Sequence, residues 1–76
     1  MPDFEMIWIT PETAFKIKKA RVDRGLSQMD LANSIDASLS QVEKYERGDV
    51  DMALDRLFDL AARLGLTPAD LLETVS

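Results

Sequence analysis

The 76-residue chain contains neither cysteine nor histidine. Without cysteine it can form no disulfide and no thiolate metal site. Without histidine it lacks the most common metal ligand and the usual general base. The sequence also shows no paired carboxylate cluster and no phosphate-binding loop, so no catalytic constellation can be assembled from it. We therefore predict no catalytic residues, no metal and no cofactor, and we expect a binding protein rather than an enzyme.

Long apolar runs and a basic N-terminal region are absent as well. A membrane-spanning helix needs about 20 apolar residues, and a secretory signal begins with a basic region. We therefore predict a cytoplasmic protein that does not contact a membrane. A domain of this size buries only about 60% of its unfolded surface, so we expect a second copy to supply further stability.

Glycine and proline are scarce, at three residues each, and they stand where helices are expected to begin and end. Thr10 and Pro11 are a typical N-cap and first position of a helix, which we expect to run to about residue 24. Ser27 and Ser38 are each followed, three residues later, by an acidic or amide side chain, as at the start of a capped helix. They are expected to begin a second and a third helix, and Gly48 ends the third.

Two further helices complete the expected bundle. Apolar residues repeat at helical spacing over residues 52–64, for which Asp51 is the expected N-cap. Thr67 begins a short fifth helix. We predict an all-α fold, a five-helix bundle over residues 10–76.

The first nine residues do not fit this helical pattern. Residues 4–9 are β-branched, aromatic and otherwise strand-like in composition. They predict either an arm, residues 1–9, that packs on the bundle, or a short strand that pairs with its copy in a second subunit.

The second and third helices have the spacing of a helix-turn-helix. Apolar side chains share one face of each helix, and the small Ala32 stands where two crossing helices would come closest. Asp36, a residue that tolerates left-handed backbone geometry, opens a tight turn between them. The outer face of the third helix is then free to enter a DNA major groove about 12 Å wide. That face comprises Leu39, Ser40, Gln41, Glu43, Lys44 and Arg47.

Three segments carry a family resemblance: IKKARVDRGLSQMDLA, SLSQVEKYERG and LDRLFDLAARLGL. Across residues 17–72 the chain resembles the lambdoid phage repressor and Cro-type (XRE-like) helix-turn-helix family. The resemblance implies a sequence-specific transcriptional regulator, typically a repressor, that binds double-stranded operator DNA with an inverted repeat as a homodimer. Compact antitoxins of toxin–antitoxin pairs share this fold, so a toxin is a further candidate partner. The alternative is a protein-interaction module with little or no DNA binding.

The resemblance also implies roles for individual residues. Side chains expected to face base edges are Gln28, Leu39, Ser40, Gln41 and Lys44. Residues expected to contact phosphate are Ser27, Ser38, Arg47 and Lys19. Arg21 and Glu46 are implied to form a structural ion pair between the first and third helices.

The formal net charge of −5 is unevenly distributed. Residues 14–25 carry five basic side chains and one acid, a net +4, whereas residues 26–49 and 50–76 each carry two basic and five acidic side chains, a net −3. Asp49 and Asp51 would repel phosphate if the segment after the third helix approached DNA. We therefore expect modest affinity for one copy and stronger binding for two.

Two arrangements are open for the outer surface of the first helix. The N-terminal arm can fold over it, or the surface can contribute to a contact between copies. The apolar candidates for such a contact are Phe15, Val22, Trp8, Leu72 and Val75.

Overall fold

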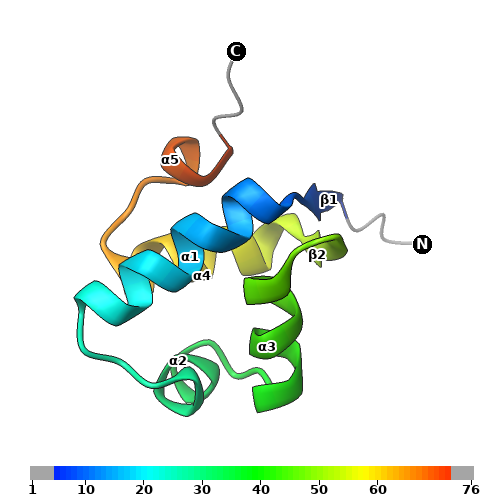
Figure 1. Ribbon diagram of the computed structural model, residues 1–76. Helices are drawn as coiled ribbons and strands as arrows, with labels where there is room; N and C mark the ends of the chain where they lie inside the picture. Colours follow the sequence, from blue (N-terminus) through cyan, green and yellow to red (C-terminus); the bar gives the residue numbers. More distant parts are fainter. Residues whose placement is uncertain (1–4, 73–76) are drawn as a thin grey trace.

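The computed structural model describes residues 5–72. Its elements in chain order are β1 (Met6–Ile9), α1 (Pro11–Asp23), α2 (Gln28–Ser34), α3 (Leu39–Arg47), β2 (Val50–Ala53), α4 (Leu54–Leu64) and α5 (Pro68–Leu72). In Figure 1, α1 crosses in front of α4, α2 and α3 lie below it, and the two strands meet at the end of α1 where that helix begins. Val75, a candidate contact residue, lies outside the described residues.

The predicted starts of the first three helices are confirmed at their caps. The Thr10 side chain accepts a hydrogen bond from the backbone N–H of Thr13, and Pro11 occupies the first helical position. Ser27 and Ser38 begin α2 and α3, each in a reciprocal capping box with the residue three positions later. Each box satisfies backbone donors that a helix start leaves without partners.

Of the two alternatives for the N-terminal segment, residues 6–9 form the strand, but its partner lies in the same chain and not in a second copy. β1 pairs with β2 in an antiparallel two-stranded sheet that places Ile7 opposite Met52 and Trp8 opposite Asp51. The fold is therefore the expected bundle of five helices, with a small two-stranded sheet added to it. The strand needs no second subunit to find this partner.

The predicted start of the fourth helix is wrong. Residues 50–53 are extended, α4 begins at Leu54, and its N-cap is Ala53, which makes no side-chain capping bond. Asp51 is therefore a strand residue and not a cap. Pairing with β1 buries Met52 to 1% exposure, and this burial outweighs the local helical tendency of the segment.

One core joins all the helices to the sheet. Ile17, Leu31, Val42, Leu57 and Leu71, from the five helices, have no exposed surface. A buried bond from the Thr13 hydroxyl to the Leu71 carbonyl, 3.0 Å long, fixes α5 on α1.

The turn after α3 depends on a glycine. Gly48 has φ +87°, and a Cβ at this position would lie 2.9 Å from Pro11 Cα. The absence of a side chain lets the end of α3 lie against the start of α1, which brings β2 alongside β1.

Within residues 5–72, no helix is long and apolar enough to cross a membrane. The same residues gather no group of three or more acidic side chains that could hold a metal ion.

Candidate nucleic-acid interface

The α2–turn–α3 unit has the compact geometry that the spacing predicts. Asp36 adopts φ +58°, in the left-handed region, and the backbone N–H of Ala37 donates to the Ala32 carbonyl at 2.9 Å. Ala32 is fully buried, which lets the two helices approach closely. The turn thereby fixes the orientation of α3 relative to α2.

One face of α3 points into solvent. Val42 and Tyr45 are buried, whereas Ser40, Lys44 and Arg47 are exposed. These three residues, spaced i, i+4 and i+7, lie along one side of the helix. We call them the α3 stripe.

Leu39 and Glu43 flank the α3 stripe. Leu39, the first residue of α3, is half-buried, so only part of its side chain is available for a contact. Glu43 is exposed beside the two cations.

The capping boxes hold polar groups in place at the starts of α2 and α3. The Ser27 and Ser38 hydroxyl oxygens accept backbone N–H bonds of 2.9 and 3.1 Å, which leaves each hydroxyl proton available to an outside acceptor. The Gln41 side-chain oxygen accepts from the Ser38 backbone N–H at 3.1 Å. The amide nitrogen of Gln41 is then positioned to donate outward.

The predicted ion pair between Arg21 and Glu46 is present and nearly buried. Arg21 Nε lies 2.6 Å from Glu46 Oε2 and Nη2 lies 3.1 Å from Oε1, which makes the pair bidentate. Arg21 Nη1 also donates to the Leu26 carbonyl at 2.8 Å. The exposed fractions of the Arg21 and Glu46 side chains are 11% and 3%. The pair ties α1 and the start of α2 to α3.

Gln28 belongs to the same cluster. Its side-chain nitrogen donates to Glu46 Oε1 at 3.0 Å, so the Glu46 carboxylate accepts three bonds from two helices. We call Arg21, Gln28 and Glu46 the Glu46 cluster. The sequence does not predict this role for Gln28, although a buried carboxylate with a single cationic partner indicates that a further donor is needed.

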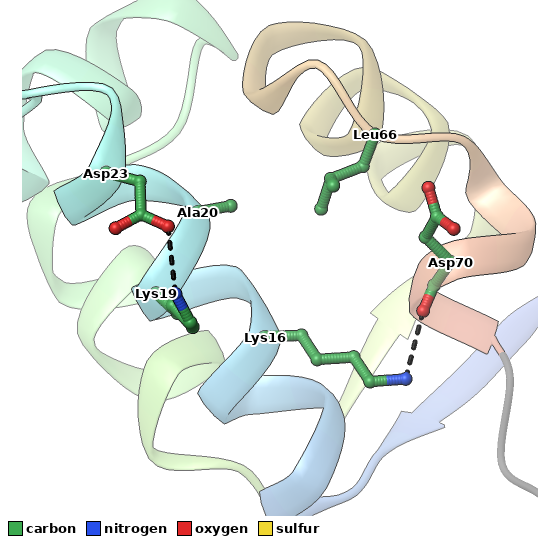
Figure 2. A pocket seen from close by; sticks show the side chains of 6 residues that line it. All are labelled: Lys16, Lys19, Ala20, Asp23, Leu66 and Asp70. Atoms are coloured by element: carbon green, nitrogen blue, oxygen red, sulfur yellow. Dashed lines mark hydrogen bonds and ion pairs between the residues drawn. The ribbon is translucent and has the colours of Figure 1, made fainter.

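Lys19 lies away from the other candidate residues. Residues that are separated by two positions in a helix point about 200° apart around its axis. Lys19 therefore points away from Arg21 and from α3. Lys19 is paired with Asp23 at 3.1 Å and lines a shallow pocket of about 340 Å³ (Figure 2). Leu66 and Asp70 line the same pocket from the other side. The structure therefore brings together the candidate residues of α2 and α3 but not Lys19.

The charge around the α3 stripe is balanced rather than strongly positive. Within α3 the carboxylates of Glu43 and Glu46 offset the charges of Lys44 and Arg47, and Asp30 of α2 is also exposed. The backbone N–H of Ser27 donates to the Asp30 carboxylate and lowers the pKa of Asp30 below its usual value, so this group stays ionised. Attraction of an anionic partner therefore depends on the placement of the two cations.

Comparisons with known proteins agree with this architecture. A model of the helix-turn-helix family HTH_3 matches residues 17–71. The chain is 35% identical over 60 residues to the HTH-type transcriptional regulator DdrOP3 of Deinococcus deserti, an alignment that covers 79% of this chain and 46% of DdrOP3. The chain thus spans about half the length of this relative.

Two solved structures have the same fold. The restriction-modification controller protein C.AhdI from Aeromonas hydrophila is 30% identical, with a TM-score of 0.74 over 80% of this chain and 92% of that chain. The biofilm regulator SinR, solved in complex with DNA, has a TM-score of 0.74 over 80% of this chain and 98% of that chain. Its identity of 24% supports likeness of fold alone. With its capped α2, its tight turn and its exposed α3 stripe, the chain belongs to the HTH_3 family of helix-turn-helix proteins.

Proposed function

We propose that this chain binds double-stranded DNA as a sequence-specific transcriptional regulator, with α3 in the major groove. The observation that carries the proposal is the α3 stripe, in which Ser40, Lys44 and Arg47 project from a helix whose opposite face is buried. A helix with its side chains is about 10–12 Å across, close to the width of the groove.

Base contacts are assigned to side chains of α3 and of the start of α2. Lys44 donates to guanine O6 and N7, Ser40 hydrogen-bonds a base edge, and the half-buried Leu39 packs on a thymine methyl. Gln41 contributes the amide nitrogen that its capping bond leaves available. Gln28 contributes only the part of its amide that Glu46 does not engage.

Phosphate contacts are assigned to the helix starts and to Arg47. The Ser27 and Ser38 hydroxyls, whose protons are not used in the capping bonds, stand at two helix N-termini, where anions are favoured. Arg47 supplies a charge at the far end of the α3 stripe. Lys19, although expected to contact phosphate, is not assigned to this interface, because it lies on the side of α1 that points away from Arg21 and α3.

Two copies on one operator fit the modest charge of a single interface. With Lys44 and Arg47 as the only basic side chains of α3, one copy neutralises few phosphates, and the salt dependence is about −0.9 per neutralised phosphate. A homodimer on an inverted repeat doubles these contacts, with half-sites about one helical turn apart.

The proposal is tested with duplexes selected from a randomised library and titrated by fluorescence anisotropy. We expect Lys44→Ala to reduce the preference for the selected duplex over other duplexes by about 1–3 kcal/mol. Arg47→Ala should weaken binding to all duplexes alike. Arg63→Ala, at an exposed position of α4, is the matched control and should leave binding unchanged. Equal losses from Arg63→Ala and Lys44→Ala would contradict the assigned face.

A protein-interaction module, such as an antitoxin that binds a toxin, is the second candidate. The observation that favours it is the acidic segment after α3, where Asp49 and Asp51 are both exposed in a chain of net charge −5. If the folded protein enriches no duplex from the library, the result would support this candidate over the regulator.

A further inference from the structure

The outer side of α1 carries a basic and apolar stripe. Phe15, Lys18, Lys19 and Val22, spaced i, i+3, i+4 and i+7, are all exposed. The exposed fractions are 64% for Phe15 and 56% for Val22, so each of these apolar side chains keeps more than half of its surface exposed. We call these four residues the α1 stripe.

The outer side of α4 carries an acidic stripe with the same spacing. Asp55, Phe58, Asp59 and Ala62 are all exposed, and Phe58 retains 45% of its surface. These four residues are the α4 stripe. It combines two negative charges with two apolar side chains, and the α1 stripe combines two positive charges with two apolar side chains.

We propose that the α1 stripe of one copy packs against the α4 stripe of a second copy. Two lysines then meet two aspartates, and Phe15 and Val22 bury their surface against Phe58 and Ala62. Each stripe would repel its own copy, so the charges select the unlike pairing. The Lys19–Asp23 pair does not prevent this, because both side chains are about 60% exposed and such pairs are weak.

The two stripes cannot meet within one chain. α1 and α4 contact each other and turn Ile17 and Leu57 into the same core, and Figure 1 shows α1 crossing in front of α4. Their outer sides therefore face away from each other on opposite sides of the molecule. A contact between unlike surfaces repeats head to tail, either as a closed ring or as an open series of copies.

This contact accounts for the uneven charge of the sequence. The +4 of residues 14–25 includes the α1 stripe, and the −3 of residues 50–76 includes the α4 stripe. The inference rests on these two helix surfaces and does not require DNA binding. If the proposed function also holds, the contact links copies bound at neighbouring sites and makes their binding cooperative.

Charge reversal tests the contact by sedimentation velocity of the full chain over a range of concentrations. The first variant is Lys18→Glu with Lys19→Glu, and the second is Asp55→Lys with Asp59→Lys. Each substitution changes the charge by two and each variant carries two substitutions, so the net charge goes from −5 to −9 in the first variant and from −5 to −1 in the second. Circular dichroism establishes that both variants retain the helical fold.

The expected result is salt-sensitive self-association of the unaltered chain and at least about tenfold weaker association of each variant alone. An equimolar mixture of the variants should associate again, because it restores unlike pairs at both kinds of contact. General charge repulsion makes a different prediction, namely that the variant of net charge −1 associates more strongly than the unaltered chain. That outcome, a mixture that does not associate, or an unaltered chain that stays monomeric at all concentrations would each overturn the proposal.

Discussion

Removal of Arg21 should destabilise the fold far more than loss of a surface ion pair. Its partner Glu46 has a side chain only 3% exposed, and two of the three bonds to that carboxylate come from Arg21. Arg21→Met would leave the buried charge with Gln28 as its only described donor. Such a loss costs about 3–5 kcal/mol. At about 0.05–0.15 kcal/mol per residue, this is a large share of the total stability of a chain of this length.

Replacement of both partners should cost much less than the sum of the single changes. In Arg21→Met with Glu46→Leu no charge remains buried, and apolar packing offsets part of the lost hydrogen bonding. Double-mutant cycles of this kind isolate the coupling between neighbouring side chains. We therefore expect a coupling energy of several kcal/mol between the two positions.

Urea unfolding followed by helical circular dichroism measures these free energies. Arg21→Lys is the conservative control, because it keeps the charge but loses the two-pronged geometry, and it should fall between the parent and Arg21→Met. A cost below about 1 kcal/mol for Arg21→Met, the value typical of exposed pairs, would refute the account of the cluster. Costs that add up in the double variant would refute the coupling.

Three further changes test other parts of the structure. Gly48→Ala should destabilise by about 1–3 kcal/mol or more in thermal unfolding, because φ +87° strains any side chain and the Cβ would lie 2.9 Å from Pro11 Cα; an unchanged midpoint would contradict this contact. Met52→Ala should cost about 2–5 kcal/mol in urea because Met52 is buried in β2, whereas a cost near zero would place this residue at an exposed helix start. The Thr67 backbone N–H lowers the pKa of the Asp70 carboxyl, so the ionised form stabilises the fold above the unfolded pKa of about 3.9, and this contribution is lost as pH falls through the lower folded pKa. Asp70→Asn should therefore be less stable than the parent near neutral pH, with a difference that shrinks in acid; a constant difference would contradict the assignment.

Local signals in the sequence were sufficient to predict most of the helices. Ser27 and Ser38 mark helix starts because a capping box is made within four residues, with no help from the rest of the fold. Asp36 also indicates the turn locally, because aspartate tolerates the left-handed backbone conformation that it adopts there. The Arg21–Glu46 pair is implied by the family resemblance and not by local chemistry.

The second strand was not predicted from the sequence, because the partner that makes it a strand is distant in the chain. Val50 and Met52 alternate with exposed acids, which is a strand pattern, but Asp51 is also a good helix cap. Pairing with Ile7, far away in the sequence, decides between the two. A helical cap is a local feature, whereas a two-stranded sheet forms only where the fold brings both strands together.

Side-chain networks in the candidate site were only partly predictable. The exposure of Ser40, Lys44 and Arg47 follows from helical periodicity alone. The engagement of Gln28 by Glu46 depends on how α2 and α3 cross, which the sequence does not specify. The position of Lys19 depends on which side of α1 faces α5, and that also is fixed only by the folded core.

The most direct test of the central claim is to follow backbone amide resonances by NMR while a selected DNA duplex is added. If α3 occupies the major groove, the changes should concentrate at Ser27, at Ser38 to Lys44 and at Arg47, and the amides of α4 should remain largely unaffected. Changes centred on the outer side of α1 or on α4, or no saturable change at low salt, would contradict the assignment of α3 as the DNA-binding helix.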